Sequence, residues 1–308
     1  TVLSLDNLPS NGQLTQQIVC EFAAKIDVAF LRWIQREVKF PSTMVDRIVP
    51  STTQKLIDRT KVKTGIHDPA VVSHEPFRQL VIEDSFVDNK RPDFSPLGAQ
   101  LVRNVKPFED MKLRMLNGTH SALAYIGSLA GHETVANAIK EESIEIFIEA
   151  LWHEEIVKSF EAPPDIDLTK YAKQLKSRYR NPEICHLLKQ IAMDGSQKLP
   201  QRIINPLFEN LSLGRPYFRL LTVVAAWIRY LQKQLTPENL YDIDDPLSQE
   251  ITAAILASDD DIGLVAQIFK IDRIFGDYPT HKISNQLISI LKRMGRFENT
   301  SLLEGNWE

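Results

Sequence analysis

The sequence has little of what marks a secreted, membrane-bound or nucleic-acid-binding protein. Its 308 residues contain only two cysteines, Cys20 and Cys185, which stand in no C-x-x-C pattern and therefore suit a reducing compartment, where they act as partly buried apolar side chains. The longest apolar run, Leu220 to Ile228, is well short of the ~20 residues that span a bilayer. The first residues lack the basic and apolar regions of a signal peptide. A net charge of −4 offers no basic face for nucleic acid. We therefore expect a cytoplasmic protein.

The sequence also lacks the spacings that predict a metal centre or a standard dinucleotide site. The seven histidines are scattered, and His153-Glu154-Glu155 has no second histidine to complete H-E-x-x-H. The acidic run Ser258 to Asp261 is better explained as a helix cap than as a metal site. Among only 12 glycines there is no G-x-G-x-x-G fingerprint. We expect no bound catalytic metal.

The first hundred residues mix strand and helix patterns. Thr1 to Leu5 alternates like a strand, and because proteins rarely begin inside a core strand we expect residues to be missing upstream. Apolar residues recur at spacings of three and four from Leu14 to Lys39, which predicts a helix. Short β-like runs follow at Val45–Val49, Val71–Val72 and Leu80–Ile82. The polar stretch Glu83 to Pro96 predicts a domain boundary.

After Pro96 the pattern is almost entirely helical. Pro107 suits the first turn of a helix that continues to about Ala130. Further helices are predicted at 135–159, 168–178, 182–192, 201–210, 217–235, 244–256, 262–269 and 281–294, and residues 295–308 should be irregular. The fold class is therefore mainly α, with the tail of an α/β domain (residues 1–95) preceding a large helical domain (residues 96–308).

The first helix of the second half carries a cluster of polar residues. With ~100° per residue, Glu109, Asn117 and His120 fall about 60°, 140° and 80° from Lys112. One acid, one amine, one amide and one imidazole thus share a face with apolar neighbours. The spacing alone is also explained by a surface ion pair between Glu109 and Lys112, with Asn117 and His120 as polar core residues.

The pattern Lys112-x4-Asn117-x2-His120 resembles the catalytic signature of the polyol-specific long-chain dehydrogenases, the family of mannitol 2-dehydrogenase and fructuronate reductase (mannonate oxidoreductase). Further segments resemble this family in the same order along the chain: Ser4–Pro9, Met44–Pro50, Glu75–Asp84 and Met193–Pro200. Five ordered matches across nearly the whole chain are more specific than one motif. The resemblance implies that residues 1–95 are the remainder of a Rossmann-like nucleotide-binding domain and that residues 96–308 form the catalytic domain.

The resemblance also implies roles at the reacting carbon. Lys112 would be the general acid/base that exchanges the hydroxyl proton while hydride passes to NAD. This role requires a lysine pKa lowered by burial. Asn7 and Asn117 would donate to the substrate oxygen, on which negative charge grows. Glu109 would relay the proton to solvent and orient the amine.

The remaining implied contacts lie farther along the substrate. His120 and Asp46 would hold hydroxyls beside the reacting carbon. Lys198 and Arg202 would bind the far end, where a carboxylate suits two cations, although they could equally be solvated charges at a helix end.

The implied function is oxidation or reduction of a six-carbon sugar acid or polyol with NAD (NADP is not excluded) and without a metal. Fructuronate/mannonate is favoured because Gln197–Pro200 resembles the sugar-acid branch, with mannitol/fructose as the alternative. The glycine-rich half of the family is missing, so we expect this chain alone to be inactive or very weak. A non-catalytic helical interaction module derived from such an enzyme is the competing hypothesis. We expect a monomer or dimer, with no nucleic-acid or membrane partner.

Overall fold

The structure is a computed structural model that describes residues 1–235 and 243–295, apart from the side chain of Ser95. The chain forms two compact units, a first unit of residues Thr1–Lys112 and a second unit of residues Leu113–Glu308.

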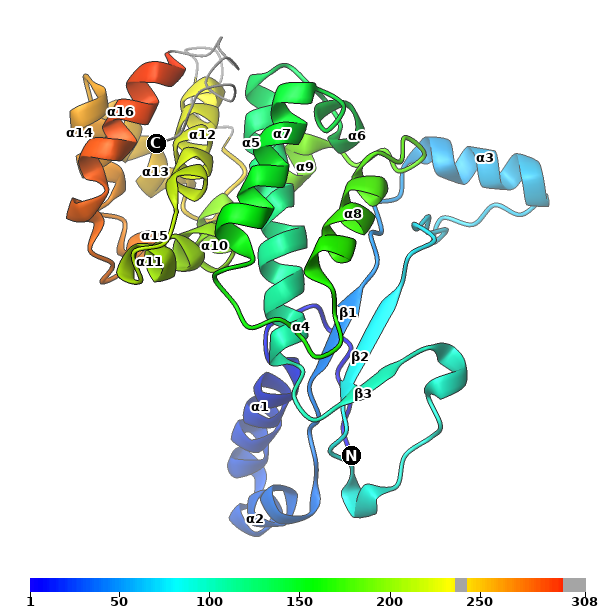
Figure 1. Ribbon diagram of the computed structural model, residues 1–308. Coiled ribbons are helices and arrows are strands. Elements are labelled where there is room, and N and C mark those ends of the chain that lie inside the picture. The colour runs from blue at the N-terminus through cyan, green and yellow to red at the C-terminus, as the bar shows by residue number, and fades with distance from the viewer. Residues whose placement is uncertain (236–242, 296–308) are drawn as a thin grey trace. The chain divides into compact units, whose positions relative to one another are not determined.

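The first unit contains a three-stranded sheet in the order β1-β2-β3. β1 (Thr43–Asp46) pairs antiparallel with β2 (Gln79–Glu83), and β2 pairs parallel with β3 (Gln100–Val102). The unit's helices are α1 (Asn11–Ile26), α2 (Val28–Glu37), α3 (Gln54–Thr64) and α4 (Lys106–Met111), with 3-10 turns η1 (Val87–Asn89) and η2 (Ser95–Leu97). Within this unit α3 stands away from the strands (Figure 1), and none of its residues is buried.

The helix predicted over residues 14–39 is two helices, because Asp27 interrupts it. Asp27 has an extended backbone (φ −161°), and its carboxylate accepts hydrogen bonds from the N–H groups of Ala29 at 3.0 Å and Phe30 at 3.2 Å. These bonds satisfy donors that the start of a helix leaves open. An aspartate inside a helical pattern therefore starts α2 here, and the prediction of one continuous helix was wrong.

The strand predictions had mixed outcomes. β2 confirms the strand predicted at residues 80–82. Of the run predicted at residues 45–49, only Val45 and Asp46 belong to β1. Residues 71–72 and 1–5 form no strand, because two β-branched residues alone do not secure a partner. Val71 instead donates to Asp68 in a turn, and Val2 makes a single backbone bond to Lys39. β3, beyond residue 96, was not predicted.

The apolar residues that predicted the first helix remain largely exposed. We define the apolar stripe as Ile18, Phe22, Ile26, Phe30 and Trp33. Its side chains are between 43% and 66% exposed. Phe30 and Trp33 stack on each other at 6.2 Å between ring centroids. The helical period identified a face that favours burial, but nothing in the described part of the first unit covers it.

The second unit is helical. Its α-helices are α5 (Gly118–Leu129), α6 (Val135–Ala138), α7 (Glu142–Ala150), α8 (Leu168–Tyr179), α9 (Leu188–Ala192), α10 (Gly195–Leu199), α11 (Asn205–Ser212), α12 (Phe218–Gln234), α13 (Ser248–Leu256), α14 (Asp261–Ile268), α15 (Asp272–Phe275) and α16 (Ser284–Met294). The 3-10 turn η6 (Thr280–Lys282) precedes α16. The described residues also include three π-helical segments: η3 (Lys112–Asn117), which begins at the last residue of the first unit, η4 (Leu151–Ile156) and η5 (Pro200–Ile204).

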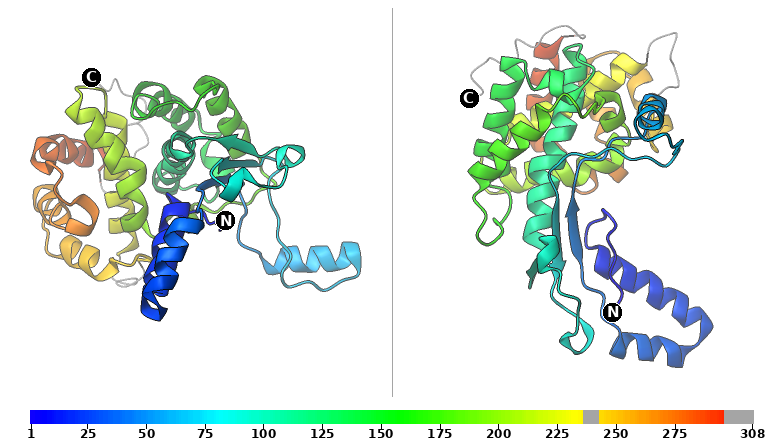
Figure 2. Two further views of the ribbon diagram at one scale, coloured as in Figure 1. Left: turned by 90° about the horizontal axis from the view of Figure 1, so that it is seen from below. Right: turned by 90° about the vertical axis from the view of Figure 1, so that its right-hand side faces the viewer.

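Two buried helices form the centre of the second unit. Every residue of α5 from Gly118 to Gly127 is buried, as is every residue of α12 from Leu220 to Leu231. The two helices pack against each other, α9 packs on α5, and α16 packs on α12 (Figure 2). At Gly127 an added Cβ would lie 2.8 Å from Ala138 Cβ, so only glycine permits this approach. Such dense packing explains why these two helices are apolar on nearly all sides.

Carboxylate side chains cap the starts of two helices of the second unit. The predicted cap at residues 258–261 is confirmed, because Asp260 accepts from Gly263 N–H at 2.7 Å and starts α14. The fully buried Glu155 accepts from the N–H groups of Arg219 and Leu220, at 2.8 and 2.9 Å, at the start of α12. Burial raises the pKa of the Glu155 carboxyl.

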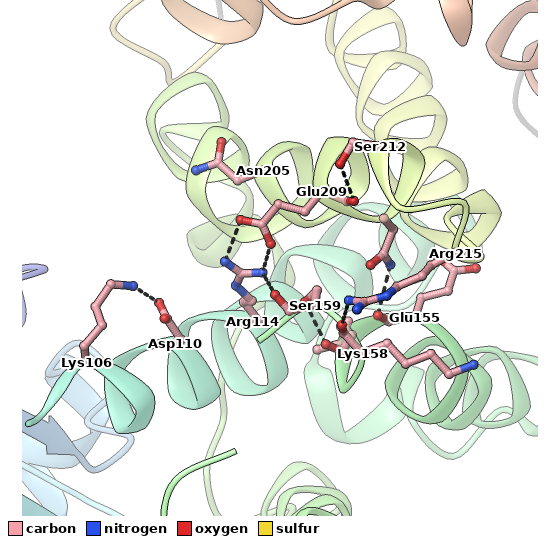
Figure 3. A network of polar contacts seen from close by, with 12 residues as sticks. Lys106, Asp110, Arg114, Glu155, Lys158, Ser159, Asn205, Glu209, Ser212 and Arg215 are labelled. Atoms are coloured by element: carbon pink, nitrogen blue, oxygen red, sulfur yellow. Dashed lines mark hydrogen bonds and ion pairs between the residues drawn. The ribbon is translucent and has the colours of Figure 1, made fainter. Parts of the chain in front are cut away.

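A polar network beside Glu155 joins further elements of the second unit. Figure 3 shows the Glu155 region, where Arg114 pairs with Glu209 and bonds to the Ser159 carbonyl. Arg215 reaches the Lys158 carbonyl nearby. These contacts join η3 to α11 and to the segment that follows η4.

The predicted helices were confirmed most fully where the apolar period is long. α12 matches residues 217–235, α8 matches 168–178 and α14 matches 262–269. Residues 182–192 are helical only from Leu188, and 135–159 divides into α6, α7 and η4. The prediction for residues 295–308 falls outside the described residues, except for Gly295.

The architecture is mainly α, as predicted, with a small sheet in the first unit. No helix among the described residues has both the length and the apolarity to cross a membrane.

Candidate active site

The predicted site residues fall into two groups, one in each unit. In the first unit, the Lys112 ammonium is buried, with the residue 8% exposed. It donates to Asn7 Oδ1 and to the Val45 carbonyl, both at 2.5 Å. Since the Asn7 oxygen faces the amine, the N–H₂ end of the same amide is directed elsewhere, as a donor to a substrate oxygen would need to be.

Asn11 fixes the segment that carries Asn7. This asparagine is 1% exposed, and its amide exchanges two 2.8 Å hydrogen bonds with Thr43 at the start of β1. It also donates to the Asp6 carbonyl at 2.9 Å, and Thr43 Oγ1 donates to the Ser4 carbonyl at 2.7 Å. The loop before Asn7 is thereby bonded to the sheet, which limits its freedom to move away from Lys112.

Glu109 lies one helical turn before Lys112 on α4 and is partly buried. Its carboxylate accepts from the backbone N–H of Ser10 at 3.1 Å. Burial raises the pKa of Glu109, opposed by the Ser10 hydrogen bond and by Lys106. A carboxyl with a raised pKa exchanges protons more readily near neutral pH than an ordinary glutamate does.

Asp46 ends β1, where it is 3% exposed. The strand places it directly after Val45, whose carbonyl accepts from Lys112. Asp46 and Lys112 are therefore held by neighbouring parts of the same unit, although their residue numbers lie far apart.

Lys112 begins a π-helical segment and Asn117 ends it. A π-helix pairs residue i with i+5 instead of i+4, so the ~100° step of an α-helix does not apply across these residues. The angle of about 140° predicted between Lys112 and Asn117 was therefore wrong. Pro107 does occupy the first turn, as predicted, and the helix beyond the π segment extends to Leu129.

In the second unit, the His120 ring is buried against two other rings. Its centroid lies 5.0 Å from that of Tyr179 and 5.1 Å from that of His186. Burial, with a contribution from Lys198, lowers the pKa of His186 to about 4. His186 is therefore neutral at physiological pH and adds no charge beside His120.

Lys198 and Arg202 lie four residues apart, and Arg202 affects the pKa of Lys198. Burial lowers the pKa of Lys198, and the neighbouring Arg202 lowers it further. Burial lowers the pKa of Arg202 to about 10. Lys198 lies 3.6 Å from the Asp194 carboxylate. This carboxylate raises the pKa of Lys198, but burial and Arg202 lower it by more. An anion bound here would favour both charged forms.

Both cations also contact the backbone. Lys198 donates to the Met193 carbonyl at 2.6 Å, just beyond the end of α9, where a cation is favoured. Arg202 donates to the Asn117 carbonyl at 3.4 Å and to Ser121 Oγ at 3.3 Å. Lys198 therefore does contact a helix end, as one of the two sequence interpretations expected. Arg202 is hydrogen-bonded to the helix that carries Asn117 and His120.

Asn11, Tyr179 and His186 were not predicted as site residues. Tyr179 and His186 lie about sixty residues from His120 along the chain, and no local spacing connects them to it. A signal for Asn11 is present in the sequence, because Asn11-Gly12 stands directly before a helical pattern. An added Cβ at Gly12 would lie 2.4 Å from the Phe40 carbonyl oxygen, so this glycine permits the close approach that Asn11 secures.

The described residues contain no group of three or more histidine, cysteine, aspartate or glutamate side chains placed to hold a metal ion. The starts of α1 and α2 also do not fit a dinucleotide pyrophosphate. Ser10, before α1, donates its N–H to Glu109, and the start of α2 is occupied by the Asp27 carboxylate. An anion would be repelled there, and no glycine-rich turn precedes either helix.

The sequence matches two family models in order along the chain. Residues 1–95 match the mannitol dehydrogenase Rossmann domain, and residues 104–294 match the mannitol dehydrogenase C-terminal domain. The chain therefore belongs to the mannitol dehydrogenase family.

Individual relatives are oxidoreductases by name. The chain is 44% identical over 250 residues to D-mannonate oxidoreductase of Escherichia coli, covering 81% of this chain and 51% of the relative. It is 36% identical over 280 residues to mannitol 2-dehydrogenase of Aspergillus terreus, covering 90% of this chain and 55% of the relative. The chain thus spans about half the length of the curated relatives it matches.

Two solved structures resemble the fold. Mannitol 2-dehydrogenase of Pseudomonas fluorescens, in a ternary complex with NAD and D-mannitol, matches with a TM-score of 0.83 and 32% identity, covering 98% of this chain and 61% of that one. A substrate-free D-sorbitol dehydrogenase matches with a TM-score of 0.85 and 25% identity, covering 98% and 62%. A Rossmann-domain region followed by a helical domain, as the sequence predicts, matches the mannitol dehydrogenase structures.

Proposed function

We propose that this chain supplies the proton-transfer and substrate-binding part of an NAD-dependent oxidoreductase that interconverts a sugar acid or polyol and its keto form. The observation that carries the proposal is the buried Lys112 amine, 2.5 Å from Asn7 Oδ1. Residues 1–95 are assigned to the remainder of the nucleotide-binding domain and residues 96–308 to the catalytic domain. Bound NAD would supply the hydride acceptor for the carbinol hydrogen.

The chain's own residues would move and stabilise the proton and the substrate oxygen. In oxidation, neutral Lys112 accepts the hydroxyl proton as the carbonyl forms, and in reduction its ammonium returns that proton to the oxygen. Asn7 and Asn117 donate amide N–H groups to the oxygen, which carries growing negative charge. Glu109, with its raised pKa, passes the proton between Lys112 and solvent. No metal is required for these steps.

The substrate class we propose is a sugar acid of the mannonate/fructuronate type. His120 and Asp46 would bind hydroxyls beside the reacting carbon, and Lys198 with Arg202 would bind the carboxylate. Burial lowers the pKa of both cations, and Arg202 lowers that of Lys198 further, so both charged forms would favour an anionic ligand. Mannitol/fructose is the second candidate, supported by the relative whose solved complex contains D-mannitol.

The test is turnover by a protein that joins this chain to a family nucleotide-binding half. It is assayed with mannonate, altronate and mannitol, using NAD and NADP in turn. Lys112→Ala should lower turnover by at least ~100-fold, because it removes the general acid/base. The matched control is Lys140→Ala, which removes a lysine that is exposed in the second unit. Equal turnover in the two variants would refute the role of Lys112.

The substrate class has its own readout. Lys198→Ala should raise KM for mannonate at least ~10-fold, since it removes one partner of the carboxylate, and change KM for mannitol far less. Equal changes for both substrates would favour the mannitol alternative. The 308-residue chain alone should show no or very weak turnover.

A further inference from the structure

Three successive carbonyls in and around the π segment η3 accept hydrogen bonds from side chains. Trp152 Nε1 donates to the Met115 carbonyl at 3.2 Å, Tyr179 donates to the Leu116 carbonyl at 3.0 Å, and Arg202 donates to the Asn117 carbonyl at 3.4 Å. Thr119 Oγ1 also donates to the Met115 carbonyl, at 2.5 Å. A π segment disturbs the regular i→i−4 ladder, and added donors on its carbonyls stabilise that register.

Two of these donors come from other π segments of the second unit. Trp152 lies on η4 and Arg202 on η5, so irregular turns of three helices meet at residues 115–117. An added Cβ on Gly118 would lie 3.1 Å from the Arg202 carbonyl oxygen, which shows how closely η5 approaches. π-bulges are rare and frequently mark functional sites, and this junction lies directly before His120.

Tyr179, the last residue of α8, contacts this junction in two ways. Its hydroxyl bonds to Leu116, four residues before His120, and its ring lies 5.0 Å from the His120 ring. The same ring stacks on Trp152 with 6.3 Å between centroids. Tyr179 is 2% exposed. One rigid side chain therefore restrains both the backbone register before His120 and the plane of its imidazole.

We propose that Tyr179 is a positioning residue that holds the π register at Leu116 and orients His120 for contact with a substrate hydroxyl. This inference rests on the proposed function for the role of His120, while the positioning itself is a property of the chain alone. His186, at 5.1 Å on an edge-to-face ring contact, restrains the same imidazole from a second direction.

The experiment uses the 308-residue chain labelled with ¹⁵N-histidine and, separately, uniformly. Tyr179→Phe keeps the ring and removes only the hydroxyl. It should shift the His120 imidazole signals, assigned with His120→Gln, and speed amide hydrogen exchange at residues 115–121 at least ~10-fold, because a restraint on local opening is lost. Tyr230→Phe is the control, since it removes a hydroxyl from another buried tyrosine, which contacts Tyr125.

A second variant, Trp152→Phe, removes the donor to Met115 and should speed exchange at the same amides. The proposal is overturned if Tyr179→Phe leaves the His120 signals and the exchange unchanged, or if Tyr230→Phe changes them equally. These results do not depend on catalysis.

A kinetic arm uses the protein joined to a nucleotide-binding half. Tyr179→Phe should lower kcat about 10-fold with KM for NAD unchanged, because orientation of the substrate contact is lost. A full wild-type kcat in this variant would overturn the orienting role. Absence of turnover in the unmutated protein would refute the proposed function, and the exchange and imidazole signals would still decide the inference about Tyr179.

Discussion

The two units differ in how far their apolar helix faces are buried. In the first unit, the apolar stripe on α1 and α2 is 43% to 66% exposed, although its spacing is that of a core-facing helix. In the second unit, α5 and α12 bury ten and twelve consecutive residues. The comparison shows that a helical period identifies a face that favours burial, but whether that face is covered depends on what else the polypeptide or its partners supply.

Burial shifts the pKa of ionisable groups in both units. It is the main cause of the shift at Glu155, His186 and Arg202 in the second unit and at Glu109 in the first. The clearer difference between the units is the burial of long helix stretches, so the stability of the second unit should respond more strongly to side-chain truncation.

The largest expected effect compares two tryptophans. Trp227 in α12 is fully buried, while Trp33 in the stripe is 49% exposed. Trp227→Ala should lower the free energy of unfolding by about 3–5 kcal/mol, through lost burial and the cavity left behind. Trp33→Ala should cost less than about 1 kcal/mol, because a partly exposed site loses little burial and leaves no enclosed cavity. Urea denaturation followed by circular dichroism measures both.

Equal losses of unfolding free energy in the two variants would contradict this difference between the units. They would mean that the stripe is covered in solution, by a second copy of the chain for example. Repeating the denaturation at several protein concentrations identifies that case, because a stability that depends on association rises with concentration.

The next effect concerns pH and is confined to the second unit. His186 has a pKa of about 4 when folded, against an ordinary 6.5. As pH falls through 6.5, the unfolded chain takes up a proton that the folded chain does not. The free energy of unfolding should then fall by up to about 3 kcal/mol between about pH 7 and about pH 4.

His186→Gln should remove most of this pH-dependent loss, and urea denaturation across the range measures the difference. His67→Gln is the control, since His67 is exposed in the first unit. If wild type and His186→Gln lose stability in parallel, His186 is not buried as a neutral ring.

Much of the fold follows from local sequence, for identifiable reasons. α12 and α8 were predicted because their apolar spacing persists over many residues. The start of α14 was predicted because Asp260 offers a side-chain acceptor to Gly263. β3 and the break at Asp27 were not, since a strand of three residues and a mid-pattern cap depend on tertiary partners more than on period.

The candidate site likewise has residues that the sequence predicts and contacts that only the fold creates. Lys112 and Asn117 came from a short motif, and the amine does lie beside Asn7. The π register between them could not be predicted, because the hydrogen-bond partner of a carbonyl leaves no mark on apolar spacing. Tyr179 reaches Leu116 across 63 residues, so only the folded second unit brings them together.

The smallest expected effect tests the stripe directly. Phe22, 66% exposed on α1, has little burial to lose, and glutamine is a good helix former. Phe22→Gln should change the free energy of unfolding by no more than about 0.5 kcal/mol. It should also raise the salt concentration at which the protein precipitates, because exposed apolar patches promote association.

The matched change is Phe147→Gln on α7 of the second unit, where Phe147 is 1% exposed. That variant should lose several kcal/mol, because it buries an amide and leaves a poorly filled site. Comparable losses at Phe22 and Phe147 would show that α1 is packed as tightly as the second unit's helices. A small change at Phe22 with higher solubility would instead locate the unsatisfied apolar surface of this chain on α1.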